Sequence, residues 1–182
     1  MAAAALSFSL AQPTLQPTRA LTDGRFESRR EASVASLAAF TGTRELTFVI
    51  PTEGSAQKIL VTLAAGQLPT WVRPAISAIV SVQTLPENWD SYGGKKINRG
   101  LISQSLSVLG LIMDATSPPP SVVPLGDGGI QLEWHRKQQD LEITFPADDL
   151  PQFFYHNRAT GVEKEGLASD VTSLAQLLRN VT

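Results

Sequence analysis

Two histidines and two nearby glutamates are the groups in this chain best suited to catalysis or metal binding. Glu133 and His135 are two residues apart in an alternating segment, so their side chains point to the same face of a strand. Glu142 and His156 belong to segments that can lie beside it. Together these side chains could form a His/His/Glu metal site, or a general base with an orienting carboxylate. The simpler interpretation is a solvated sheet face with a cross-strand Glu/His pair. We therefore assign no catalytic residue, no metal and no cofactor.

A second concentration of functional groups occupies residues 85–94, which read LPENWDSYGG. Glu87 and Asp90 flank Trp89, and an apolar ring beside a carboxyl group can raise its pKa enough for acid/base work. The alternative is a built turn in which Asp90 bonds the backbone and Glu87 is solvated. We favour the turn, because catalysis requires geometry as well as carboxylates. Trp89, Asp90 and Tyr92 remain candidates for binding.

Consecutive aromatic residues supply a further hint of a binding surface. Phe153, Phe154 and Tyr155 must alternate between the two faces of a strand, so one face carries a ring that is either exposed or covered by another element. Lys95, Lys96 and Arg99 could meet a phosphate at a helix N-terminus, although basic side chains there more often project into water. The candidate binding residues are therefore Trp89, Asp90, Tyr92, Glu133, His135, Phe154 and His156.

Composition narrows the class of protein that must position these residues. The chain has 182 residues, of which 42% are hydrophobic and 18% charged, as in a protein with one main domain. The formal net charge is −2, so no overall positive field attracts nucleic acid or an anionic membrane. There is no cysteine, which fits the cytoplasm and excludes thiolate chemistry. No apolar run is long enough to span a membrane.

The first 43 residues differ from the rest. Residues 1–23 mix small and polar residues around two prolines and predict a mobile tail, and residues 25–40 favour a short helix that Gly42 would stop. The start lacks the basic region of a signal peptide. Residues 44–182 are expected to form a single domain.

Within that domain, the alternation in 44–50 and 58–63 predicts two strands that can pair as a hairpin, which could join either edge of a larger sheet. Helices are expected over residues 74–82 and from Asn98 to about Asp114. The second is so apolar that it is either sandwiched or carries an oligomer contact.

The C-terminal half predicts a β-meander. Short turns separate five segments, and connections this short cannot cross over between parallel strands, so the sheet is antiparallel. The segments are residues 121–125, 130–135, 141–145, 151–156 and 162–165. Ser169 or Asp170 caps a final amphipathic helix. The expected fold is a two-layer α+β domain in which helices cover the apolar face of about four to six strands.

Two motifs in this half also carry a resemblance. The order Asn88-Trp-Asp-Ser-Tyr-Gly93 and then Gly128-Gly-Ile-Gln-Leu-Glu-Trp134 resembles a family of small bacterial proteins with NWDSYG-type and GGIQLEW-type motifs. The resemblance covers roughly residues 85–180 and implies no activity, because the family is uncharacterised.

These observations predict a cytoplasmic protein-binding module with a protein partner or a second copy as its ligand. Such a module could be one half of a bacterial two-gene system, such as a toxin and its neutralising partner or a defence complex. Two alternatives stay open. One is a small metal-dependent hydrolase or nuclease using Glu133, His135 and His156 with Glu87 or Asp90, and the other is a structural component of a larger assembly.

Overall fold

The computed structural model describes residues 6–11, 44–52, 55–63 and 68–182. Most of the predicted N-terminal tail, and the short helix expected within residues 25–40, lie outside the described residues.

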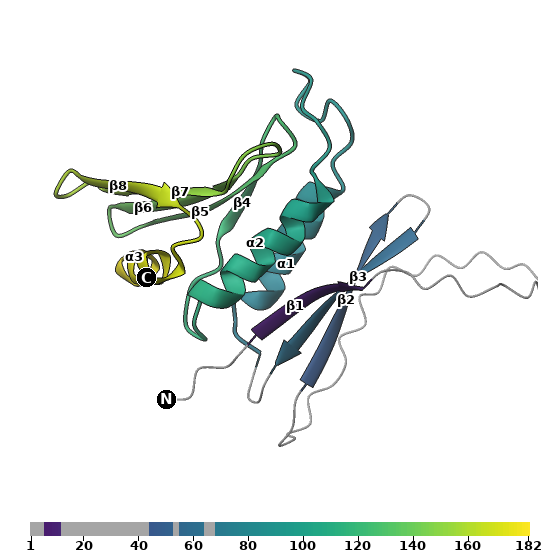
Figure 1. The fold of residues 1–182 in the computed structure, drawn as a ribbon, viewed down its shortest axis with the longest axis horizontal. Coiled ribbons are helices and arrows are strands. Elements are labelled where there is room, and N and C mark those ends of the chain that lie inside the picture. Colours follow the sequence, from purple (N-terminus) through teal and green to yellow (C-terminus); the bar gives the residue numbers. More distant parts are fainter. Residues whose placement is uncertain (1–5, 12–43, 53–54, 64–67) are drawn as a thin grey trace, which may run out of the picture.

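A five-stranded antiparallel sheet forms the centre of the C-terminal half (Figure 1). Its spatial order is the chain order, so the predicted meander is confirmed. Pro124 lies in an edge strand, where its missing N–H costs no ladder bond. The strands are β4 (Ser121–Pro124), β5 (Ile130–Arg136), β6 (Gln139–Phe145), β7 (Gln152–Asn157) and β8 (Val162–Leu167).

Three helices accompany this sheet: α1 (Val72–Gln83), α2 (Arg99–Ile112) and α3 (Val171–Val181). The predicted caps are present, because Asn98 accepts a hydrogen bond from Gly100 N–H and Asp170 accepts one from Ser173 N–H. Helix α3 packs across β5 and β6, α2 packs against α3, and α1 lies against β4. The α+β class with helices over one face of the sheet is thus confirmed.

The core lies between this sheet and the helices. The hydrophobic residues that alternate along β5 and β6 are each at most 2% exposed, namely Ile130, Leu132, Trp134, Leu141, Ile143 and Phe145. Trp134 is among them, and its indole Nε1–H donates to the Pro118 carbonyl at 2.9 Å. Burial of one face fixes the register, since a slip by one residue would turn the polar face inward.

A second, three-stranded sheet lies on the other side of the helices (Figure 1). It contains β1 (Leu6–Ala11), β2 (Arg44–Thr52) and β3 (Ser55–Leu63) in the order β1-β3-β2. The predicted hairpin is β2–β3, which joins neither edge of the larger sheet. Residues 6–11 were assigned to the tail but form a strand, because Leu6, Phe8 and Leu10 alternate with serines.

Candidate functional site

The segment Asn88–Gly94, which we call the corner, is a loop closed by its own side chains. Asn88 N–H donates to the Gly94 carbonyl at 2.7 Å, and the Asn88 side-chain oxygen accepts from Gly93 N–H at 2.8 Å. Asp90 Oδ1 accepts from two backbone amides, those of Tyr92 and Gly94, each at 2.8 Å. Both polar residues therefore act on the backbone, as the turn interpretation predicted.

This closure holds a backbone that is otherwise unfavourable. Asn88 and Ser91 have φ values of 59° and 65°, and Gly93 has a φ of 92°. Non-glycine residues adopt such values at a cost unless the surroundings enforce them. The Tyr92 and Gly94 amides, which bond the charged form of Asp90, lower the pKa of that carboxyl group. Asp90 is consequently ionised at neutral pH and serves as the acceptor at the centre of the loop.

The corner is also fastened to the turn between β4 and β5. Lys95 N–H donates to the Gly126 carbonyl at 3.0 Å, and Asn98 N–H donates to the Gly128 carbonyl at 2.9 Å. A Cβ at Gly128 would lie 2.7 Å from the Lys96 carbonyl oxygen, so the two backbones meet only because this residue is glycine. The two sequence motifs thus come together in one assembly.

The turn itself is built around Asp127. Its Oδ1 accepts from Gly129 N–H at 2.8 Å and its Oδ2 accepts from Ala147 N–H at 3.0 Å. A Cβ at Gly129 would lie 2.6 Å from the Phe145 carbonyl oxygen. Asp127 thereby joins the β4–β5 turn to the end of β6, which gives the corner a fixed support.

The residue that this assembly presents is Tyr92, whose side chain is 93% exposed. Trp89 is half-buried, and its indole nitrogen has no hydrogen-bond acceptor among the residues that the structure describes. A Cβ at Gly94 would come within 2.8 Å of that nitrogen. Trp89 therefore packs on the loop's own backbone, whereas Tyr92 points away from it.

The acid/base hypothesis for the corner finds no support in this geometry. Glu87 accepts a hydrogen bond from Lys96 N–H at 3.2 Å, and Asp90 is held by two amides.

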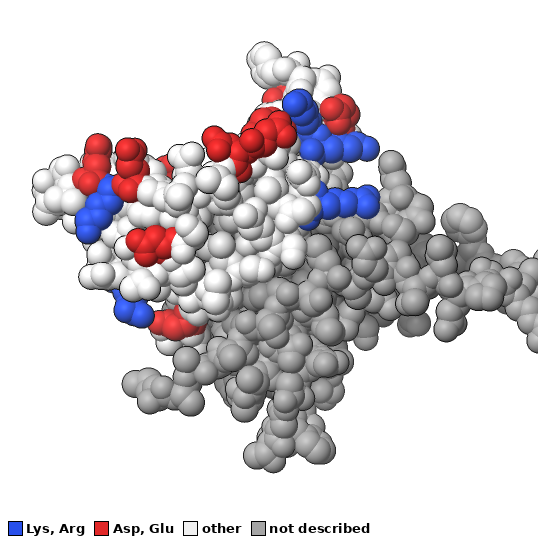
Figure 2. Space-filling view, viewed as in Figure 1, with Lys and Arg blue, Asp and Glu red and all other residues white. Residues whose placement is uncertain are grey.

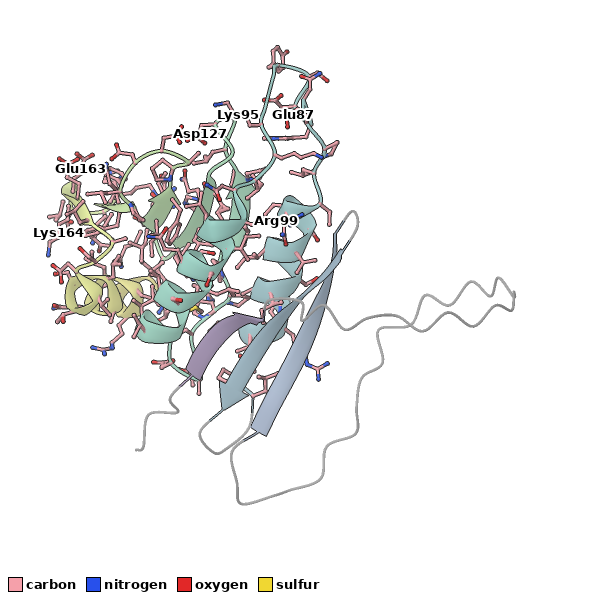
Figure 3. All side chains as sticks on the ribbon, turned by 45° about the vertical axis from the view of Figure 1, so that its right-hand side comes forward. Glu87, Lys95, Arg99, Asp127, Glu163 and Lys164 are labelled. Carbon is pink, nitrogen blue, oxygen red and sulfur yellow. The ribbon has the colours of Figure 1, made fainter. Side chains whose placement is uncertain are left out.

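Figure 3 places Glu87 and Lys95 at the corner and Arg99 at the start of α2. In Figure 2 the basic side chains gather on this side of the molecule.

The second group of candidates lies on the face of the sheet opposite the helices, which we call the open face. His135 Nδ1 is 2.7 Å from Asp140 Oδ1, and its Nε2 is 3.1 Å from Glu133 Oε2. The hydrogen bond with Asp140, and then that with Glu133, raise the pKa of His135. Arg158 Nε lies 3.0 Å from the other Asp140 oxygen. Gln131 joins the cluster by donating to Glu133 at 3.0 Å.

The His/His/Glu metal site is not assembled. Both ring nitrogens of His135 already face carboxylates, and His156 Nδ1 is 4.0 Å from Asp140 Oδ2. Within residues 6–11, 44–52, 55–63 and 68–182, no three His, Asp or Glu side chains are arranged to hold a metal ion. The open face also lies apart from the corner, as Glu163 and Glu87 show in Figure 3. The structure therefore does not bring Glu87 or Asp90 to the histidines.

Phe154 is the aromatic residue that the β7 segment leaves accessible. Phe153 and Tyr155 are buried, whereas Phe154 is 37% exposed on the open face. The strand register puts it between Glu142 on β6 and Glu165 on β8. Acidic side chains lie along the upper rim of the molecule in Figure 2, over the sheet.

Sequence reasoning missed a groove at the end of the sheet. It runs between α2 and the two loops that flank β7 and β8, and no single segment has a pattern that reveals it. Most of its lining is apolar: Gln104, Val108, Leu150, Pro151, Leu167, Ala168 and Ser169. Helix α2 is sandwiched between other elements, which is one of the two alternatives predicted from its apolar sequence. Leu111 is the large hydrophobic residue that this helix exposes, at 64%.

Comparison with models of protein families, with curated proteins and with solved structures gives no match for this chain. In the part of the chain that the structure describes, no helix has the length and apolar character needed to cross a bilayer.

Proposed function

We propose that this chain is a protein-binding module and that the corner Asn88–Gly94 is its contact centre. The observation that carries the proposal is Tyr92, an aromatic side chain that is 93% exposed on a loop whose backbone is fixed by Asn88 and Asp90. Tyrosine is enriched among the residues that dominate binding energy at protein interfaces. A loop that is already ordered loses little conformational entropy on binding.

The energetics of the corner favour recognition over stability. Three residues with positive φ are held in place by hydrogen bonds, yet the side chain of Tyr92 adds little to the stability of the fold because it contacts mainly solvent. Strain that is maintained around an exposed aromatic is the arrangement expected of a site that binds something. A protein surface offers shallow depressions into which one projecting ring can pack.

We extend the proposal to one partner of a bacterial two-gene system, such as a toxin-neutralising pair or a defence complex. The support is the small size of the chain and its resemblance to a family of small bacterial proteins. The enzyme alternative lacks an assembled site among the described residues. A structural role in a larger assembly would use the same contact centre.

The test is an affinity purification from the native cells with three tagged forms: wild type, Tyr92→Ala and Leu111→Ala. Leu111 is a matched control, because it is also large, exposed and distant in sequence from the corner. We expect one stoichiometric partner with wild type and Leu111→Ala, and about tenfold weaker binding of the purified partner to Tyr92→Ala. A monomer without a partner, or a partner bound equally by Tyr92→Ala, would refute the proposal.

A further inference from the structure

Among the strands that the structure describes, none pairs with the outer edge of β8, and the backbone groups at this edge lie in a defined phase. Ala168 N–H donates to the Pro151 carbonyl at 2.8 Å, so these two residues form a hydrogen-bonded pair at the end of the β7–β8 ladder. Hydrogen-bonded and non-hydrogen-bonded pairs alternate along an antiparallel ladder. Residues 162, 164 and 166 therefore bond to β7, so the N–H and C=O groups of Glu163 and Glu165 and the N–H of Leu167 point outward, while the Leu167 carbonyl accepts from Asp170 N–H at 3.1 Å.

The side chains of the same three residues share one face. Glu163, Glu165 and Leu167 are opposite His156, Phe154 and Gln152 on β7, so they lie on the open face. All three are exposed, and Leu167 also lines the apolar groove at the end of the sheet. The edge thus offers two carboxylates and then an apolar residue, beside the outward-pointing N–H and C=O groups of Glu163 and Glu165 and the N–H of Leu167.

From this juxtaposition we infer that β8 is a docking edge for an extended, basic segment of a partner protein, which adds to the sheet as an antiparallel sixth strand. A segment in this orientation meets Leu167 first, then Glu165, then Glu163. Its pattern would be apolar-x-basic-x-basic, with the basic side chains directly opposite the two glutamates on the open face. The inference rests on the proposed function only in taking the ligand to be a protein, since this edge is separate from the corner.

The negative charge of the open face favours a basic segment as the occupant of the β8 edge. The open face of β5 to β8 carries five carboxylates and no Lys or Arg within the strands: Glu133, Asp140, Glu142, Glu163 and Glu165. Opposite charges facing one another across strands stabilise pairing, and like charges destabilise it. The exposed ring of Phe154, next to Glu165, offers a further contact for a cationic side chain.

The same rule argues against a second copy of this chain. If β8 paired with β8 around a two-fold axis in either of the two registers with the longest overlap, centred on Lys164 or on Glu165, Glu165 would face Glu163 or Glu165 of the other copy. Two carboxylates opposite each other are unfavourable. The glutamates therefore protect the edge from self-pairing while leaving it open to a basic strand.

The test uses the full chain labelled with 15N and the peptide acetyl-Thr-Val-Thr-Lys-Thr-Arg-Thr-amide. Hydrogen exchange is measured by NMR for the amides of Glu163, Glu165 and Leu167, which point outward and are therefore expected to exchange rapidly in the free protein. We expect the peptide to slow exchange at these three amides, and a peptide of the same composition with Lys and Arg adjacent to do so much less. No slowing, slowing elsewhere only, or equal effects of the two peptides would overturn the inference.

Two variants at one position separate charge from backbone. Glu165→Gln removes the carboxylate and keeps the outward N–H, and we expect it to bind the peptide roughly fivefold more weakly. Glu165→Pro also removes that N–H, which bonds nothing on β7, so we expect no detectable binding while the other amide signals keep their positions. If the Glu165→Pro substitution disturbs the structure of β8, the hydrogen-exchange measurement on the wild-type chain still tests the inference. Tyr92→Ala should bind the peptide normally, which distinguishes failure here from failure of the corner.

Discussion

The corner and the β8 edge present different groups to a partner protein: a side chain at the corner and backbone groups at the edge. At the corner Asn88 and Asp90 satisfy the backbone amides, and what remains for a partner is one side chain, Tyr92. At β8 no described strand pairs with the outer side of the backbone, and the side chains of Glu163 and Glu165 restrict what can pair with it. A closed loop selects a partner through an aromatic contact, whereas an open edge selects through hydrogen-bond phase and charge.

The turns that lead to the two regions provide the largest expected effect. A Cβ at Gly129, beneath the corner, would lie 2.6 Å from the Phe145 carbonyl, whereas a Cβ at Gly161, in the β7–β8 turn, would meet no atom within 4 Å. We expect Gly129→Ala to lower the free energy of unfolding by about 3 kcal/mol, since backbone must move. Gly161→Ala should cost about 1 kcal/mol for its φ of 69°. Urea denaturation measures both, and equal losses would show that the corner's support is not rigid.

Removing the Asp90 carboxylate, the acceptor at the centre of the corner, should disorder the corner and leave the rest of the fold unchanged. In Asp90→Ala the Tyr92 and Gly94 amides lose their shared partner, so we expect their hydrogen exchange to accelerate and partner binding to fall about tenfold, as for Tyr92→Ala. Asp149→Ala is the matched control, because Asp149 is an exposed carboxylate that bonds only the adjacent Leu150 amide. Unchanged binding by Asp90→Ala would mean that the loop's order is irrelevant to recognition.

Acid should loosen the corner only at a pH below the ordinary pKa of an aspartate. Because the folded state lowers the pKa of Asp90 below its ordinary 3.8, this group stabilises the fold above pH 3.8 and the contribution is lost as the pH falls through the lowered value. We expect the Tyr92 and Gly94 amide signals to move in that acidic range. An NMR titration that shows them moving near pH 6 instead would contradict the assignment of Asp90 as the acceptor.

The smallest expected effect concerns His135 on the open face. Its pKa is raised above 6.5, so its contribution to stability is complete below pH 6.5 and is lost as the pH rises through the raised value. We expect Asp140→Asn to lower the pKa of His135 more than Glu133→Gln does, since the Asp140 hydrogen bond is the larger cause. Because His135 is largely exposed, the stability change should stay below about 1 kcal/mol. Titration of the His135 ring protons by NMR tests the order of the two variants.

Much of the fold was predictable because its signals are local. Alternation of Ile130, Leu132 and Trp134 with polar residues has one interpretation, a half-buried strand, and the turns between strands are too short for any crossover. The caps Asn98 and Asp170 act on amides two or three residues away, so their role follows from sequence. The placement of the β2–β3 hairpin was not predictable, since it depends on which apolar surface of the helices is left uncovered.

The features of the candidate site also separate into those encoded locally and those that depend on tertiary structure. Local chemistry was enough to predict that Asn88 and Asp90 would build a turn, because both bond the backbone within a few residues. That Tyr92 would be exposed while Trp89 is half-buried required the tertiary structure, since the choice depends on packing against Gly94. The surroundings of His135 likewise depend on tertiary structure, because the neighbouring strand brings Asp140 to one of its ring nitrogens.

The meander, its buried and open faces, and the turn chemistry of the corner can be predicted from sequence, because each depends on periodicity or on contacts between near neighbours. Three further features emerge only from the folded arrangement: the corner rests on the β4–β5 turn, the open face gathers carboxylates from β5, β6 and β8, and β8 is an edge among the described strands. Those features depend on which strands become neighbours and which remain unpaired. They are relations between distant segments, and no single segment encodes them.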